Sequence, residues 1–224
     1  RRSRQRSPWG GGGVGCRRGR VNGVQRGVDW GEPSPVPHGA VWVADDAAAA
    51  TVVTEARRAG EPPPRLCLTG GDLARTLGGR ADADRLRNHD ATHVSVDLGA
   101  ALLDGRLHWF IAHLVARRSW WWGPITVVAN AAFIGRWNVA PRAHPGDGRL
   151  DLLVADPPVG HRLRARRRLP LGTHVPHPDI IERRITAHQV DFDRPVDVHL
   201  DGTRHRGVRA LSVRVEPAAL DVWI

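Results

Sequence analysis

The stretch that most constrains the fold runs over residues 125–157, where two apolar segments enclose a segment rich in Gly, Pro, Asn and Asp. The apolar segments, 125–129 and 150–155, have the length of buried strands and are bounded by turn-forming residues. Because proline fixes φ and glycine permits positive φ, the enclosed segment is predicted to be a long shaped loop. Loops held between strands often carry function, and this loop contains Asp147 and ends beside Asp151.

A strand–helix–strand pattern precedes this stretch. Residues 41–43 and 66–68 are short apolar runs, and the residues between them keep helical spacing from Asp45, the expected N-cap, to Gly60. The pattern predicts a βαβ unit, with a parallel strand pair and a right-handed crossover.

A glycine turn follows the second of these strands, in the sequence Thr-Gly-Gly-Asp-Leu-Ala-Arg-Thr-Leu-Gly-Gly at 69–79. Glycines between a parallel strand and a helix direct backbone N–H groups toward a crevice, which favours anions such as phosphate. The alternative is an ordinary strand-to-helix turn. From the residues alone both interpretations of Gly70, Gly71 and Asp72 remain open.

The rest of the chain favours β-structure. Asp104-Gly105 lies between the alternating runs 93–98 and 106–115, a strong hairpin signal, and Asp201-Gly202 is a second turn of this kind. One helix is expected at 159–169. Four further strands are expected near the end of the chain, at 182–191, 196–200, 210–215 and 220–224.

The predicted fold class is therefore α/β plus β: a reduced N-terminal βαβ, nucleotide-binding-like unit followed by a β-rich, β-sandwich-like C-terminal domain. The expected boundaries are a disordered basic, Gly-rich tail at 1–20, the α/β unit at 21–90 and the β-rich domain at 91–224.

The net charge of +10 is carried by arginine alone, because the sequence contains no lysine. A Walker-type P-loop requires a lysine on the phosphates, so that class of ATP site is excluded. The charge itself has two interpretations: the composition of a GC-rich coding sequence, or attraction to an anionic membrane, nucleotide or nucleic acid.

No apolar run reaches the length of a membrane helix, and no apolar h-region follows the basic start. The two cysteines, Cys16 and Cys67, provide no disulfide framework, which indicates the cell interior. The missing initiator Met suggests a fragment or a displaced start.

Three consecutive tryptophans, Trp120, Trp121 and Trp122, follow two arginines. Tryptophan beside arginine suits the headgroup level of a membrane. The alternatives are that these rings fill the space between sheet and helix, or that they stack on nucleic-acid bases.

The histidines give no metal signature. His174 and His177 are three residues apart without other candidate ligands nearby in the sequence, so we do not predict a zinc site there. His113 is expected to be a structural histidine rather than a ligand.

Four segments in the right order resemble bacterial diacylglycerol kinase-like lipid kinases, members of the superfamily that also holds NAD kinases and sphingosine kinases. They are GGDLARTLGG at 70–79, VDLG at 96–99, the 128–151 region ending in Pro-Gly-Asp-Gly-Arg-Leu-Asp, and LDG at 200–202. The similarity covers roughly residues 66–224 and looks closest to a short actinobacterial branch.

The resemblance implies transfer of a phosphoryl group from ATP to a lipid hydroxyl, with Mg²⁺. It implies a nucleotide crevice lined by Gly70, Gly71, Arg75 and Thr76, catalytic roles for Asp72 and Asp201, and a metal-binding role for Asp147 and Asp151. The glycine turn and the aspartate loop should then face each other across a cleft. Trp120 to Trp122 would contact lipid, and the expected location is the cytoplasm, peripheral at the inner membrane.

Two departures from the family pattern stand out. The Gly-Gly-Asp-Gly-Thr nucleotide motif expected upstream of the glycine turn is missing, and Thr203 stands where the family has an acidic residue after Asp-Gly. Since threonine is no general base at neutral pH, activity could be weakened or lost. The rival interpretations are a non-catalytic lipid- or membrane-binding module and, less favoured, an arginine-rich nucleic-acid binder; a homodimer is compatible with each.

Overall fold

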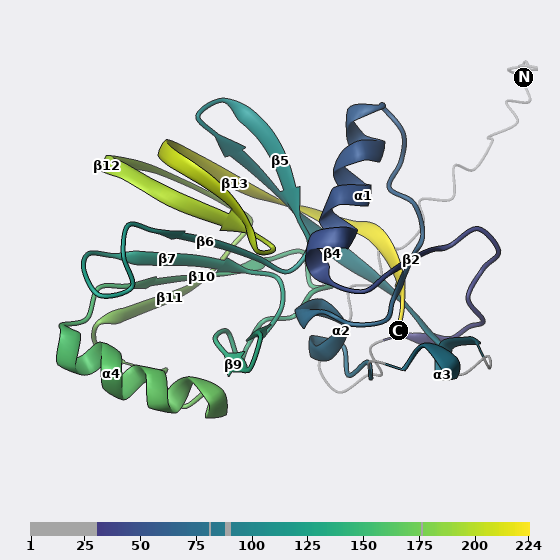
Figure 1. Cartoon of the computed structure of the whole chain (residues 1–224), viewed down its shortest axis with the longest axis horizontal. Helices are drawn as coiled ribbons and strands as arrows, with labels where there is room; N and C mark the ends of the chain where they lie inside the picture. The colour runs from purple at the N-terminus through teal and green to yellow at the C-terminus, as the bar shows by residue number, and fades with distance from the viewer. Residues whose placement is uncertain (1–30, 81, 88–90, 176) are drawn as a thin grey trace, which may run out of the picture.

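The computed structural model describes residues 31–80, 82–87, 91–175 and 177–224 (Figure 1). The tail predicted at 1–20 lies outside the described residues. The described chain is organised around one eleven-stranded sheet with few helices, which confirms the predicted fold class.

The predicted βαβ unit is present. Its elements, with the short strand before it and the two helices after it, are β1 (Glu32–Pro33), β2 (Val41–Val43), α1 (Asp46–Arg58), β3 (Leu66–Leu68), α2 (Asp72–Thr76) and α3 (Ala83–Arg87). β2 and β3 pair in parallel. Asp45 is the N-cap of α1, because its Oδ1 accepts a hydrogen bond from the N–H of Ala48 at 2.8 Å.

The remaining elements form most of the sheet. They are β4 (Thr92–Leu103), β5 (Arg106–Phe110), β6 (His113–Arg117), β7 (Ile125–Ala129), β8 (Phe133–Ile134), β9 (Trp137–Asn138), β10 (Leu150–Ala155), α4 (Val159–Arg168), a 3₁₀ turn (Leu169–Leu171), β11 (Ile180–Ile185), β12 (Ala187–Leu200) and β13 (Thr203–Trp223). The strand order is β1-β4-β13-β12-β6-β7-β10-β11, with β5 paired to β4 and a separate β8–β9 hairpin.

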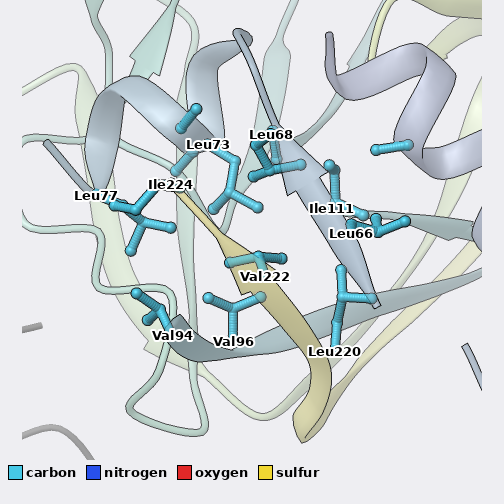
Figure 2. Close-up of a cluster of buried hydrophobic side chains, with 14 of the residues drawn as sticks. Leu66, Leu68, Leu73, Leu77, Val94, Val96, Ile111, Leu220, Val222 and Ile224 are labelled. Atoms are coloured by element: carbon cyan, nitrogen blue, oxygen red, sulfur yellow. The ribbon is translucent and has the colours of Figure 1, made fainter. Parts of the chain in front are cut away.

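The end of β13 joins the two parts of the molecule. Val222 and Trp223 pair in parallel with β3, so the βαβ unit extends the same sheet. Figure 2 shows the core that results, in which side chains of β3 and α2 pack against β4 and the chain end: Leu66, Leu68, Leu73, Leu77, Val94, Val96, Leu220, Val222 and Ile224. The glycine turn between β3 and α2 is therefore held in place by a core that the βαβ unit shares with β4 and the end of the chain.

Both Asp-Gly pairs make the predicted hairpin turns. Asp104 and Gly105 have φ of 47° and 82°, and Asp201 and Gly202 have 45° and 88°. Two successive residues with positive φ match the twist of antiparallel strands, and Asp and Gly are among the residues that tolerate this geometry.

The prediction of one strand over 106–115 is wrong. β5 ends at Phe110 and β6 begins at His113. The intervening N–H groups of Ile111 and Ala112 bind the Asp201 carboxylate instead of a neighbouring strand. Alternation in the sequence continues across this break, so the pattern alone could not locate it.

The four strands predicted at the chain end are wrong in their bounds. The run 182–191 is divided between β11 and β12, while the runs 196–200, 210–215 and 220–224 belong to two long strands. Their pairing shifts between Asp191 and Val196 and between Glu216 and Leu220. A bulge interrupts the period of two without ending the strand, which makes one strand resemble two.

Candidate active site

A cavity of about 840 Å³ lies on one face of β6, β7 and β10. Its floor includes Val115, Val127 and Leu153, which are directly opposite one another on these strands. In Figure 1, α4 and β9 lie on the same side of β10 and β11. Side chains from these elements and the segments beside them contribute further apolar lining: Trp120, Ile134, Trp137, Val139, Ala165 and Leu169.

One end of the cavity is polar. Asp45, Asp46, Asp72, His113 and Asp201 all line it, and they come from both parts of the chain. The cavity thus combines a long apolar body with a carboxylate-rich end at the junction with the βαβ unit. Such a pocket suits a ligand that has a large apolar part and a small polar group.

Asp72 begins α2 at this polar end. Its two oxygens accept the N–H of Gly135 at 2.9 and 3.0 Å, and Oδ2 lies 4.0 Å from Nδ1 of His113. Burial raises the pKa of Asp72, whereas burial lowers the pKa of His113 to about 4. His113 is therefore neutral at pH 7, and Asp72 is a carboxylate with an increased affinity for a proton.

The glycine turn is packed against the connection between β2 and α1. A Cβ at Gly70 would lie 2.5 Å from a backbone oxygen of that connection, and one at Gly71, where φ is +99°, would lie 2.6 Å from Oδ1 of Asp46. The Asp46 carboxylate accepts the N–H groups of Asp72 and Leu73 at 2.5 and 3.2 Å. Burial raises the pKa of Asp46 to about 6. A protein carboxylate thus binds the backbone N–H groups that we expected to face a phosphate.

Arg75 and Thr76 tie α2 to the residues on either side of β8. Nη1 of Arg75 donates to the carbonyl of Gly135 at 2.6 Å, and its guanidinium lies 4.1 Å from the centroid of the Phe133 ring. The Thr76 hydroxyl accepts the N–H of Ala132 at 2.9 Å. Both side chains therefore have structural partners at the positions where nucleotide contacts were expected.

Asp201 holds the reversal between β5 and β6. Its carboxylate accepts the N–H groups of Ile111, Ala112 and His113 at 2.7, 3.0 and 2.8 Å. Burial raises the pKa of Asp201 to about 7 in spite of these bonds. This geometry positions the segment that carries His113 beside Asp72.

Asp147 and Asp151 both lie beside Arg184. Arg184 pairs with Asp147, and its Nε lies 3.9 Å from Oδ1 of Asp151. That oxygen is buried without a hydrogen bond, and burial raises the pKa of Asp151 to about 6. Within the described chain, neither carboxylate belongs to a group of three metal-ligating side chains at ion distance. Since a guanidinium already supplies the positive charge here, the residues fit a Mg²⁺ ion poorly.

The aspartate loop and the glycine turn lie on the same sheet face. Asp151 is directly opposite Ala129, which is opposite His113, the neighbour of Asp72. Strands are about 4.8 Å apart, so Asp151 lies roughly 10 Å from His113 along the row. However, Asp72 lines the cavity, whereas Asp147 and Asp151 do not. The cavity is therefore not the shared cleft that we expected between the glycine turn and the aspartate loop.

The tryptophan segment lies at the rim of the cavity. Trp120 and Trp121 line it and are 46% and 45% exposed, while Trp122 is 70% exposed. Arg162 of α4, itself buried, donates to the carbonyls of Trp120 and Gly123 at 3.2 and 2.6 Å. The segment is thus fastened to α4 through its backbone while its rings face outward and into the cavity.

Several residues of the site were not foreseen. Asp46 follows the N-cap of α1 and could have been noticed only as a second acidic residue in the first turn. Asp97, in the quoted VDLG segment, accepts the N–H groups of Gly148 and Ala218 and so anchors the aspartate loop. Arg162 is one of several arginines in α4, and nothing in the sequence distinguishes it. His174 has a backbone partner, because its Nε2 lies 3.0 Å from the carbonyl oxygen of Val139.

Over the described residues, none of the helices has the length and apolar character needed to span a membrane. A search of curated proteins found no match. Among solved structures, two from Bacillus anthracis str. Sterne, both described as candidate diacylglycerol kinases, resemble this chain. One is 13% identical with a TM-score of 0.56 and the other 12% with 0.54, and each match covers 71% of this chain and 69% of the other. Identities this low establish a shared fold.

The decisive comparison is with protein families. Residues 84–224 match the model of the YegS C-terminal NAD kinase beta sandwich-like domain. The match covers more than half of the chain and includes the cavity floor, α4 and the tryptophan segment. The chain belongs to the family defined by this domain.

Proposed function

We propose that the chain transfers the γ-phosphoryl group of ATP to the hydroxyl of a diacylglycerol-type lipid bound in the cavity. The observation that carries this proposal is the amphipathic cavity, apolar over β6, β7 and β10 and carboxylate-lined at one end. A diacylglycerol has two acyl chains and one hydroxyl, so the chains match the apolar body and the hydroxyl matches the polar end. Membership of the family supports the same chemistry.

In this proposal Asp72 accepts the proton of the lipid hydroxyl. The hydroxyl oxygen forms a bond to the γ-phosphorus, the bond from that phosphorus to the bridging oxygen breaks, and ADP leaves. A base that is partly desolvated, with a raised pKa, suits this task. Asp201 acts as a positioning residue for His113. Mg²⁺ would arrive with the ATP phosphates and neutralise their charge, and we route no step through Asp147 or Asp151.

The test is transfer of radiolabelled phosphate from ATP to diacylglycerol in mixed micelles with Mg²⁺. Asp72→Asn keeps an oxygen for the Gly135 N–H but removes the base, so we expect a fall of roughly 10²–10⁴-fold. Asp84→Asn, on the exposed surface of α3, is the matched control and should stay at the wild-type rate. Equal transfer by wild type and Asp72→Asn would refute the catalytic role.

A second function, lipid binding without catalysis, is favoured by one observation. The backbone N–H groups of the glycine turn are bound by Asp46, and Thr203 replaces an acidic residue, so the ATP side is poorly equipped. This alternative predicts diacylglycerol binding that needs no ATP and no detectable transfer by the wild type. The two functions therefore differ in the radiolabel assay and agree in a binding assay.

For either function we propose that Trp120, Trp121 and Trp122 contact the membrane surface from which the lipid enters. Indole rings at the cavity rim, next to a strongly basic helix, match an anionic interface. A nucleic-acid role is less well supported, because several arginines are paired within the chain: Arg57 with Glu216, Arg142 with Glu182, Arg162 with Asp156 and Arg204 with Asp197.

A further inference from the structure

Outside the cavity, His161, His177 and Asp179 converge at the outer surface of α4. Their candidate ligand atoms all lie within 4.8 Å of one another, the one such group in the described part of the chain. Nδ1 of His161 is 3.0 Å and Nδ1 of His177 is 3.7 Å from Oδ2 of Asp179. We propose that these three side chains bind a divalent transition-metal ion of the Zn²⁺ type, and that this ion fixes the position of α4, which forms the roof of the cavity.

The distances fit a tetrahedral ion. With ligand bonds of 2.0–2.1 Å, the edges of a Zn²⁺ tetrahedron are about 3.3 Å long. The two nitrogen–oxygen distances fall on either side of this value, and the two histidine nitrogens lie within 4.8 Å of each other, so the side chains would draw together around an ion. Two imidazoles and one carboxylate are a common donor set for Zn²⁺ and its neighbours in the first transition row.

The protonation pattern also favours a cation. The N–H of Asp179 donates to Nδ1 of His177 at 3.2 Å, so this nitrogen presents a lone pair. No proton then lies between it and the Asp179 carboxylate, and two electron-rich atoms face each other at 3.7 Å. A metal ion would convert this contact into an attraction, exchanging the backbone hydrogen bond for a coordinate bond.

The backbone holds the three ligands in place before any ion binds. His161 lies in the first turn of α4, where its N–H donates to the Pro158 carbonyl at 2.8 Å. His177 forms a bridge with Ile180, and the Asp179 carbonyl accepts the N–H of Asp156 at 3.3 Å. The side chains are 41%, 26% and 32% exposed for His161, His177 and Asp179, so an ion can enter from solvent and keep a water ligand.

The site would act on the cavity through α4. His161 precedes Arg162, which binds the tryptophan segment, and Ala165 and Arg166 of the same helix line the cavity. An ion that joins the first turn of α4 to the start of β11 would limit movement of this roof. The inference does not depend on phosphoryl transfer.

The test is calorimetric titration of the untagged, chelator-treated full chain with Zn²⁺ and, separately, Co²⁺. We expect one equivalent bound through this site, and a loss of at least tenfold in affinity on His161→Gln or Asp179→Asn. His205→Gln is the matched control, since His205 makes an edge-to-face contact with His108 at another place on the sheet. Binding that is unchanged in both site variants, or that is lost in His205→Gln, would overturn the proposal.

A second measurement needs no variant. Side-chain ¹⁵N spectra of the wild-type chain should show the Nδ1 signals of His161 and His177 shifting on addition of one equivalent of Zn²⁺. The same addition should slow tryptic cleavage after the α4 arginines several-fold. No change in either histidine signal would contradict the site even if a variant failed to fold.

Discussion

The two regions that meet at the polar end of the cavity differ in how much of their surface stays open. In the βαβ unit, the N–H groups and side chains of the glycine turn are bound within the protein, by Asp46, Gly135 and Ala132. In the β-rich part, the apolar face of β6, β7 and β10 is open to the cavity, and α4 lies on the other side of that cavity. A glycine turn after a parallel strand can thus be closed by a nearby carboxylate, whereas the apolar cavity beside it stays open.

The largest change in stability is expected from Asp46→Ala, which tests whether the glycine turn needs the Asp46 carboxylate. The change leaves the N–H groups of Asp72 and Leu73 without their partner, at a cost of roughly 2 kcal/mol in unfolding free energy. Urea denaturation measures it, with exposed Asp84→Ala as control. If the turn is instead a phosphate-binding site that Asp46 occupies, millimolar phosphate should replace the lost carboxylate. It should then restore the stability of Asp46→Ala and leave that of the control unchanged.

A smaller effect, of opposite sign, is expected from Asp151→Asn. Burial raises the pKa of Asp151 to about 6, so the folded chain holds this proton up to about pH 6 and the unfolded chain only to about pH 4. The stability from this group is complete below pH 4 and is lost as the pH rises through 6. Asp151→Asn should therefore gain roughly 1–2 kcal/mol at pH 8 and almost nothing at pH 4.

The same variant also tests whether the aspartate loop binds a metal ion. If it does, Mg²⁺ would stabilise the wild type at pH 8, and Asp151→Asn would be less stable than the wild type when Mg²⁺ is present. Thermal unfolding with and without Mg²⁺ separates these results.

The smallest effect is expected from Trp122→Ala. Its indole is the most exposed of the three and lines no part of the cavity, so its loss should lower co-sedimentation with anionic vesicles about two- to threefold without changing stability. Leu102→Ala, exposed on β4 away from the rim, is a comparable apolar truncation. Equal effects of the two would contradict the membrane-contact surface.

Much of the fold could be predicted from the sequence because its signals are local. The Asp45 cap, the short parallel strands and the two Asp-Gly turns each depend on a few neighbouring residues. The bounds of β12 and β13 could not, since a bulge resembles a strand end.

The candidate site was less predictable, because its contacts join distant residues. Asp72 could be named from its motif. The link from Asp46 to Asp72 spans 26 residues, that from Asp201 to Ile111 spans 90, and Arg184 reaches the aspartate loop only through strand pairing. None of these pairs leaves a pattern in one sequence, and neither does the approach of His161 to His177.

Both proposed functions require that a lipid occupies the cavity. The direct measurement is binding of dioctanoylglycerol by calorimetry to the wild type and to Leu153→Trp, which fills the cavity floor from β10. Leu152→Val is the control, because Leu152 packs on the opposite face of the same strand. We predict at least tenfold weaker binding for Leu153→Trp and unchanged binding for folded Leu152→Val; unchanged binding by Leu153→Trp would contradict the account.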